Sequence, residues 1–319
     1  MEKLNKLKII FMGTPEFAAI ILSDLLKSGH QIISIYTQKD KKVGRQQKIE
    51  KSAVKRIAEE NNLKIFQPER FEAEVISEIK EQNPDIIVVA AYGKILPKDL
   101  LLIPKFGVIN THPSLLPKYR GASPIQNALL NGEKETAATI MLMEEKVDAG
   151  KILSQKKVEI KDDETYLELS KRLAKISAEL LNDTLSLWVA GKINPVQQDE
   201  QLATFCQLIK KEDGKINWSN EARSIYNHYR AFVVWPGIFT YWEKENKKFR
   251  LKLNKISLDW NESQKNLQNG TVFSENDQIK IKTGKGNINI QEVQLEGKNK
   301  MSINDFVRGY PNFIGSVLK

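Results

Sequence analysis

The chain has 319 residues, 41% hydrophobic and 28% charged, and a formal net charge of +9 at pH 7. This length and composition favour a soluble globular protein of about two domains. A single cysteine, Cys206, excludes an internal disulfide framework; we expect it to be buried, in a reducing compartment.

The N-terminal run KIIFM follows positive charges, as in a signal peptide, but Gly13, Pro15 and Glu16 interrupt it. No apolar run approaches the roughly 20 residues of a membrane span. We therefore expect a cytoplasmic protein without a membrane partner.

In the first half of the chain, short β-rich runs alternate with segments of helical periodicity. LKIIFM predicts a strand, and Glu16 to Lys27 predicts a helix that ends at Ser28-Gly29. The alternation continues through QIISIYT, SAVKRIAEEN, LKIF, FEAEVISEIKEQN, DIIVVAA, FGVIN, PIQNALLN and TAATIMLM. DIIVVAA is typical of a strand buried on both faces. The pattern predicts an α/β, doubly wound domain with a mostly parallel sheet.

A helix from Asp163 to about Ala190 closes this domain, predicted to span residues 1–190. Residues 191–207, with Pro195 and the polar run VQQDEQ, are predicted to be a linker. In residues 208–319, short alternating runs such as GIFTYW and QIKIKT lie between Asn, Gly and Asp turns. They predict a small antiparallel β-barrel or sandwich.

Most of the net positive charge lies in this last region. Residues 208–319 hold 19 Lys and Arg against 12 Asp and Glu, a net +7. Such a basic domain suggests a polyanionic partner such as nucleic acid. A solvated basic surface stays the alternative.

Several common chemistries lack their motifs. The first strand-to-helix turn, MGTPEFAA, has one glycine and no G-x-G-x-x-G, and the chain has no G-x-x-x-x-G-K-[ST] and no G-x-S-x-G. Histidine and cysteine are not clustered at metal-binding spacing. These observations argue against nicotinamide and P-loop nucleotides, a catalytic serine and a metal.

Three polar residues follow predicted strands. Asn110 and His112 end FGVI, and Asp148 follows TAATIMLM, so they meet if those strands are neighbours. These three groups suit acyl transfer without a protein nucleophile. The amide stabilises an oxyanion, the imidazole accepts or donates a proton, and the carboxylate orients the imidazole. Turn or cap roles are the alternative.

Four segments of the chain resemble the formyltransferase family that uses formyl-tetrahydrofolate. In chain order they are FMGTPEFA, AYGKILP, INTHPSLLPKYRGASPIQ and VDAGKIL. KINW, RAFVVWPGIFTYW and MSINDF favour the branch that acts on tRNA over single-domain or sugar-modifying relatives. The resemblance covers both domains. It implies a Rossmann-like first domain and an OB-like C-terminal barrel.

The resemblance also implies transfer of the formyl group of 10-formyltetrahydrofolate to the α-amino group of methionine on initiator tRNA. Asn110, His112 and Asp148 match the family's catalytic residues. Residues from Met141 to Asp148 are expected in the folate site, together with Ile95, Leu96, Pro97, Ser114, Leu115, Leu116 and Pro117.

The basic segment Thr37 to Lys51 stands where the family has a loop that contacts the tRNA acceptor end. Its expected tRNA contacts are Lys41, Lys42, Arg45 and Lys48, with Arg45 as the key contact. A solvated charged loop is the alternative.

Two other functions stay open, namely formylation of an amino-sugar nucleotide and RNA binding without catalysis. The basic barrel argues against the first, and the three polar site residues argue against the second. His30 and His228 are expected to be structural. We expect the protein to be a monomer.

Overall fold

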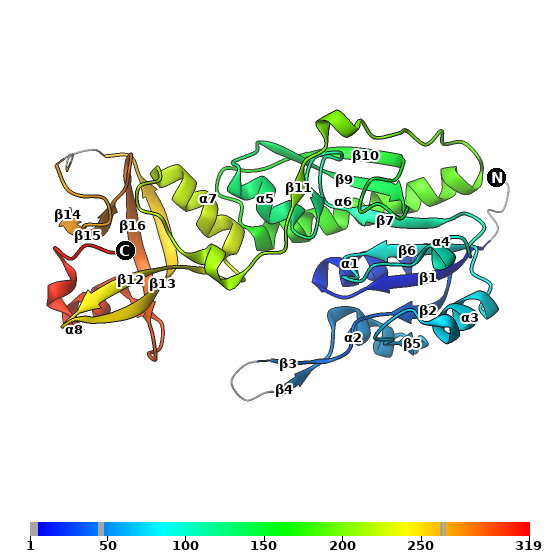
Figure 1. The fold of residues 1–319 in the computed structure, drawn as a ribbon, viewed down its shortest axis with the longest axis horizontal. Coiled ribbons are helices and arrows are strands. Elements are labelled where there is room, and N and C mark those ends of the chain that lie inside the picture. The colour runs from blue at the N-terminus through cyan, green and yellow to red at the C-terminus, as the bar shows by residue number, and fades with distance from the viewer. Residues whose placement is uncertain (1–5, 44–47, 262–263, 265) are drawn as a thin grey trace. The chain divides into compact units, whose positions relative to one another are not determined.

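The structure, a computed structural model, describes residues 6–43, 48–261, 264 and 266–319 (Figure 1). The chain forms two compact units. The first runs to Pro124 and takes in Glu135–Ile160 and Glu168–Gln207, and the second comprises Ile125–Lys134, Lys161–Leu167 and Leu208–Lys319. Within the described ranges, no helix combines the length and apolar character that a membrane crossing requires.

A seven-stranded sheet forms the centre of the first unit, in the order β10-β9-β7-β6-β1-β2-β5. Its strands are β1 (Lys8–Gly13), β2 (Gln31–Tyr36), β5 (Ile65–Phe66), β6 (Ile86–Ala90), β7 (Val108–His112), β9 (Glu135–Leu142) and β10 (Ile152–Glu159). The five strands from β7 to β5 are parallel to their neighbours. The predicted mostly parallel, Rossmann-like sheet is therefore confirmed.

The run TAATIMLM forms β9, and this strand pairs antiparallel with β7, as β10 does with β9. Antiparallel neighbours need only a short connection, and residues 143–151 join β9 to β10 as a hairpin loop. The sheet thus changes direction at β7, the strand that ends in His112.

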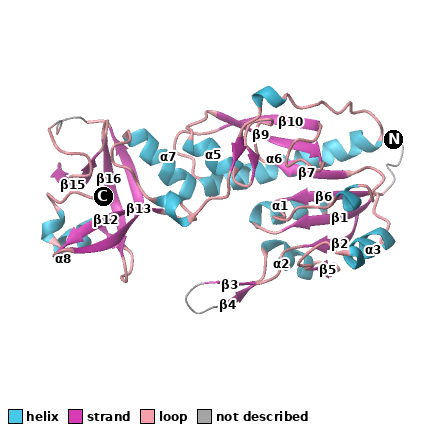
Figure 2. Ribbon diagram, in the orientation of Figure 1, coloured by secondary structure: helices cyan, strands magenta, loops and turns pink. Residues whose placement is uncertain are grey.

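Helices lie on both sides of this sheet (Figure 2). They are α1 (Glu16–Leu25), α2 (Ala53–Glu60), α3 (Ala73–Glu81), α4 (Lys98–Leu101) and α6 (Tyr166–Val189). The helix α5 (Pro124–Leu130) belongs, from Ile125 on, to the second unit. The central strand β6 is buried along its whole length, as its unbroken apolar sequence predicts. A Cβ atom on Gly13 would lie 2.7 Å from the Cβ of Ala18. This glycine therefore allows close packing of strand and helix.

Two small pairs of strands lie outside the main sheet. The first is the hairpin of β3 (Lys41–Val43) and β4 (Lys48–Glu50). In the second, β8 (Arg120–Gly121) pairs in parallel with β11 (Phe205–Cys206). Residues 191–207, predicted from composition to be a linker, belong to the first compact unit in the structure.

The second unit is a curled antiparallel sheet consistent with the predicted OB-like barrel, in the order β12-β13-β16-β15-β14, with β17 beside β16. Its strands are β12 (Ile238–Lys244), β13 (Lys247–Asp259), β14 (Val272–Glu275), β15 (Gln278–Lys282), β16 (Asn287–Leu295) and β17 (Met301–Ser302). Its helices are α7 (Ala222–Phe232) and α8 (Ile303–Gly309). Three short 3₁₀ helices, η1 (Glu200–Leu202), η2 (Lys211–Gly214) and η3 (Pro311–Phe313), complete the chain.

The core of this second unit is built from aromatic side chains and branched aliphatics. The ring of Trp242 meets those of Phe306 and Phe313 edge to face, with centroids 5.7 and 5.4 Å apart. Such edge-to-face pairs are favourable beyond the area that they bury. The strand pattern that predicted a barrel is therefore matched by a continuous hydrophobic core.

Candidate functional site

The structure brings Asn110, His112 and Asp148 together in the first unit. Asn110 and His112 lie on β7 and are 8% and 4% exposed. The Asn110 Nδ2 atom donates to Asp148 Oδ1 over 3.4 Å, and His112 Nδ1 lies 3.7 Å from Asp148 Oδ2. The three groups that sequence spacing linked thus form one nearly buried polar cluster.

The loop between β9 and β10 carries Asp148 to this position. The backbone N–H of Met143 donates to the Val108 carbonyl at the start of β7, and that of Leu142 donates to the Lys151 carbonyl. A Cβ atom on Gly150 would lie 1.8 Å from the Leu142 carbonyl oxygen, so the two sides of the loop meet where only glycine fits. The loop therefore folds back along β7.

The hydrogen bond between His112 and Tyr119 defines the tautomer of the neutral His112 ring. Its Nε2 atom lies 3.0 Å from the carbonyl oxygen of Tyr119, and a carbonyl can only accept. In the neutral ring the proton is therefore on Nε2, and the lone pair of Nδ1 faces Asp148. The nitrogen beside the carboxylate is the one that can take up a proton.

The Asp148 carboxylate is held from a second direction by the backbone of β8. The N–H of Gly121 donates to Asp148 Oδ2 over 2.8 Å. Gly121 has φ +113°, and a Cβ atom there would lie 2.3 Å from the carbonyl oxygen of Cys206. Only glycine allows this backbone to reach Asp148 with β11 packed beside it.

Cys206 is buried, as the sequence predicted, and burial raises the pKa of its thiol. Its Sγ atom donates to the Arg120 carbonyl over 3.3 Å. A buried thiol with a raised pKa is inert, so we assign it a packing role beside the cluster.

The segment predicted to contact folate is partly exposed and partly in the core. Ile95 is 83% exposed, whereas Leu96 is 5% exposed and packs in the cluster that contains Tyr92 and Leu100. Pro97 precedes the first turn of α4. Of the neighbouring side chains Ile95 and Leu96, only that of Ile95 is exposed enough for a ligand to reach.

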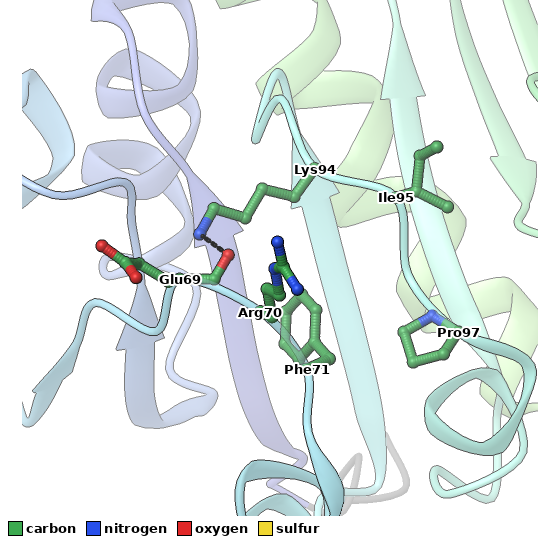
Figure 3. A pocket seen from close by; sticks show the side chains of 6 residues that line it. All are labelled: Glu69, Arg70, Phe71, Lys94, Ile95 and Pro97. Atoms are coloured by element: carbon green, nitrogen blue, oxygen red, sulfur yellow. Dashed lines mark hydrogen bonds between the residues drawn. The ribbon is translucent and has the colours of Figure 1, made fainter.

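Ile95 and Pro97 also line a cavity of about 420 Å³, shown in Figure 3. Its other walls are Glu69, Arg70, Phe71 and Lys94. Figure 3 shows Lys94 reaching the segment of Glu69, whose carbonyl oxygen accepts from its Nζ atom over 2.7 Å; the Pro68 carbonyl is a second acceptor. Burial lowers the pKa of Lys94.

The residues from Ser114 to Pro117 lie just beyond β7. Ser114 Oγ donates to the Lys118 carbonyl over 2.7 Å, and the Ser114 carbonyl accepts from Thr139 Oγ1. Leu116 is 3% exposed, and Leu115 and Pro117 are half-buried. Ser114 and Leu116 hold the turn after His112 in place.

The predicted tRNA contacts fall on the β3–β4 hairpin. Lys41 is exposed and lies opposite Glu50. Lys42 pairs with Ile49, and Lys48 pairs with Val43. Arg45, the residue expected to be the key contact, lies outside the described residues.

Sequence reasoning missed a polar group behind Asp148. Arg120 is 0% exposed, and its guanidinium donates to Gln198 Oε1 and to Glu200 Oε1. Gln198 in turn donates to the backbone of the Asp148 loop. The arginine stands in the motif KYRG, but the polar run VQQDEQ gave no sign of burial.

The other two histidines have structural surroundings. His228 Nε2 lies 2.6 Å from the Asp213 carbonyl, and its ring meets Phe232 edge to face. Partial burial lowers the pKa of His30. Among the residues that the structure describes, no group of three or more His, Cys, Asp or Glu could hold a metal ion.

The fold and this cluster define a two-domain protein with a Rossmann-like sheet, an OB-like barrel and an amide–imidazole–carboxylate site. Its sequence matches the family described as formyl transferase over residues 6–185, and the formyl transferase C-terminal domain over residues 208–311. The chain belongs to the formyl transferase family.

Two relatives of known name are similar over almost their whole length. The methionyl-tRNA formyltransferase of Caldicellulosiruptor saccharolyticus is 44% identical over 314 residues, which is 97% of this chain and 99% of the relative. The methionyl-tRNA formyltransferase of Caldanaerobacter subterraneus subsp. tengcongensis is 40% identical, covering 98% of this chain and 100% of the relative.

Among solved structures, the N-formyltransferase of Helicobacter canadensis, in complex with folinic acid and dTDP-3-aminofucose, superposes with a TM-score of 0.65. It is 20% identical, and the match covers 89% of this chain and 99% of that one. At this identity the likeness establishes the fold.

Proposed function

We propose that this protein transfers the formyl group of 10-formyltetrahydrofolate to the α-amino group of methionine on initiator tRNA. The observation that carries the proposal is the buried cluster of Asn110, His112 and Asp148, in a chain up to 44% identical to methionyl-tRNA formyltransferases. Preorganised donors and a carboxylate in a nearly buried site suit a reaction in which charge develops on a carbonyl oxygen.

The formyl donor supplies an activated one-carbon group, and the side chains stabilise its transfer. The neutral α-amine attacks the formyl carbon, and negative charge develops on the formyl oxygen. The Asn110 amide donates to this oxygen. The Nδ1 atom of His112 accepts a proton from the attacking amine. It then returns this proton to the nitrogen of the formyl donor as the bond between that nitrogen and the formyl carbon breaks.

Asp148 stabilises the imidazolium that forms in this step. Its Oδ2 atom lies 3.7 Å from His112 Nδ1 and is fixed by the Gly121 N–H. A carboxylate and an imidazolium at this distance attract each other. The carboxylate is thus assigned the role of holding and charging the base.

The cavity beside Ile95 fits part of the proposed donor. Phe71, Ile95 and Pro97 give apolar walls for a ring, and Arg70 adds a positive charge. Together with the residues from Ser114 to Pro117 and the loop before Asp148, we assign this region to folate binding.

We assign tRNA binding to the β3–β4 hairpin and to the basic barrel. The hairpin places Lys41, Lys42 and Lys48 on adjacent strands, and Arg45 lies between them in sequence. In this proposal residues 1–190 form the catalytic domain and residues 208–319 the tRNA-binding domain. Residues 191–207 join them in sequence, and Gln198 in this segment contacts the Asp148 loop.

One assay tests the function. The protein is incubated with 10-formyltetrahydrofolate and, in parallel, methionyl initiator tRNA, methionyl elongator tRNA or an amino-sugar nucleotide. We expect formyl transfer to the initiator tRNA at the highest kcat/KM. Transfer to the sugar nucleotide alone, or to none of the three acceptors, would contradict the proposal.

A further inference from the structure

The backbone of Asp148 is in a conformation that needs external support. Its φ angle is +50°, in the left-handed region that residues other than glycine seldom adopt. The preceding residues, from Glu144 to Val147, are exposed, so they pack against little. The position of the Asp148 carboxylate therefore depends on contacts made by the loop backbone as well as on the Gly121 N–H and the Asn110 amide.

One side chain provides these contacts. The Nε2 atom of Gln198 donates to the Asp148 carbonyl over 2.9 Å and to the Gly150 carbonyl over 2.7 Å. Gln198 is 5% exposed, so these bonds form away from water. Loss of the Gln198 donor would remove this hydrogen bond from both carbonyl groups. An unpaired polar group away from water lowers the stability of the folded loop.

Arg120 fixes which end of the Gln198 amide faces the loop. Its Nε and Nη2 atoms both donate to Gln198 Oε1, over 3.1 and 2.9 Å. A flipped amide would set donors against the guanidinium and an acceptor against the two carbonyls. Because Arg120 is fully buried, the orientation of the amide is set by the fold.

A second connection runs through Glu200. Its carboxylate accepts from Arg120 Nη2 over 2.8 Å and is also paired with Lys146, a residue of the Asp148 loop. The hydrogen bond from Arg120 first, and that from Lys146 next, lower the pKa of Glu200 to about 2. The negative charge that balances Arg120 is therefore present at neutral pH.

Three successive residues thus serve the site in different ways. The Tyr119 carbonyl binds His112, the Arg120 side chain orients Gln198, and the Gly121 N–H binds the Asp148 carboxylate. From this arrangement we infer that Gln198, oriented by Arg120, is a positioning residue for Asp148. It sets the distance between the Asp148 carboxylate and the His112 ring by holding the loop backbone.

The inference deepens the proposed formyl transfer and rests on it. Gln198 touches the backbone of a site residue rather than the reacting atoms, so its effect is on kcat through geometry. A misplacement of a reacting group by about 1 Å can cost on the order of 100-fold in rate. Because the loop before Asp148 is also assigned to folate binding, we expect KM for the formyl donor to rise with the change, whereas KM for tRNA stays unchanged.

The test compares Gln198→Glu with Gln201→Glu. Both replace an amide by a carboxylate on the same segment, but residue 201 is exposed. At residue 198 the new carboxylate keeps its acceptor toward Arg120 and loses the donor to the loop. We expect kcat to fall about 10-fold or more for Gln198→Glu, with KM for tRNA within about twofold, and no change for Gln201→Glu.

The pH dependence of kcat separates positioning from a merely structural role. Displacement of the Asp148 carboxylate changes the geometry of the groups that act in transfer, so the pH profile of kcat should change at residue 198 and stay as in the wild type in Gln201→Glu. Because Gln198→Glu also adds a charge beside the site, Gln198→Met, uncharged and similar in length, is measured in the same way, and the same change is expected. The folded fraction is determined for each variant by urea unfolding.

Two results would overturn the inference alone. One is a folded Gln198 variant with wild-type kcat and pH profile, and the other is a loss of rate that follows the folded fraction with an unchanged profile. A wild-type protein that transfers no formyl group would instead overturn the proposed function, and the inference with it.

Discussion

The Asp148 site and the β3–β4 hairpin are both polar, but they are built in opposite ways. Asn110 and His112 are nearly buried, and every group of the site is tied to another by a short contact. On the hairpin, Lys41 and Glu50 are exposed. The comparison teaches that charge stabilisation at a reacting carbon requires fixed donors, whereas attraction of a polyanion requires charge that water still surrounds.

The largest expected effect is at the buried site. Replacement of His112 by Ala removes the base and a donor, and we expect kcat for formyl transfer to fall by roughly 100-fold or more. KM for tRNA should change little, because the hairpin is untouched. Steady-state kinetics with varied tRNA measures both constants. A folded His112→Ala protein with near-normal kcat would mean that the reaction takes place elsewhere.

The sequence predicted the parts of this site that depend on local pattern. The apolar run IIVVA marked β6 as a strand buried on both faces, and Asn110 and His112 stood out where the apolar run FGVI ends. It predicted neither the antiparallel direction of β9 nor the strand β10, whose middle residues Gln155 to Lys157 are polar. Strand direction and pairing depend on contacts distant in sequence.

Gln198 illustrates the same limit. In VQQDEQ it has the composition of a solvated linker, yet its amide binds the Asp148 carbonyl, 50 residues earlier in the chain, and Arg120, 78 residues earlier. Composition describes the neighbours in sequence, whereas the burial of Gln198 depends on segments distant in sequence, such as Ile152, which pairs with Val196. The side chains of the proposed site could therefore be selected from the sequence, and the residue that contacts the backbone at Asp148 could not.

The second prediction concerns the hairpin. Replacement of Arg45 by Ala should raise KM for tRNA and lower kcat/KM about 10-fold, since a charge-assisted phosphate contact is worth about 1.5 kcal/mol. Affinity for the formyl donor should not change. Kinetics and donor binding are compared with Lys175→Ala, an exposed lysine on α6. A loss of donor affinity with normal tRNA kinetics would assign the hairpin to the wrong substrate.

A smaller effect is expected from the barrel, the other exposed basic region. If exposed lysines on β13 such as Lys247 and Lys255 contact phosphates, the double Gln variant should reduce the slope of log affinity for tRNA against log salt by about 0.7 to 0.9 per lost contact. Lys175→Gln serves as the control. Equal slopes for the wild type and the double variant would exclude these two lysines from the tRNA surface.

The smallest expected effect concerns the ion pairs of Glu200 with Arg120 and Lys146, and whether they stabilise the folded protein. The pKa of Glu200 is lowered, by the hydrogen bond from Arg120 first and from Lys146 next, to about 2, against an ordinary value of 4.5. A depressed pKa favours the folded state while the group is ionised. This contribution is fully present above about pH 4.5 and is lost as the pH falls through 2. The Glu200 side chain is 50% exposed, so screening by water keeps the gain small.

Glu200→Gln isolates this contribution, because an amide does not titrate. We expect the difference in the free energy of unfolding between wild type and Glu200→Gln to be constant from pH 7 to about 5 and to shrink steadily on further acidification. Urea unfolding at each pH measures it, with Glu144→Gln, an exposed change on the Asp148 loop, as the control. A difference that does not vary with pH would show that the ionised carboxylate adds nothing, and that Arg120 and Gln198 hold the loop without it.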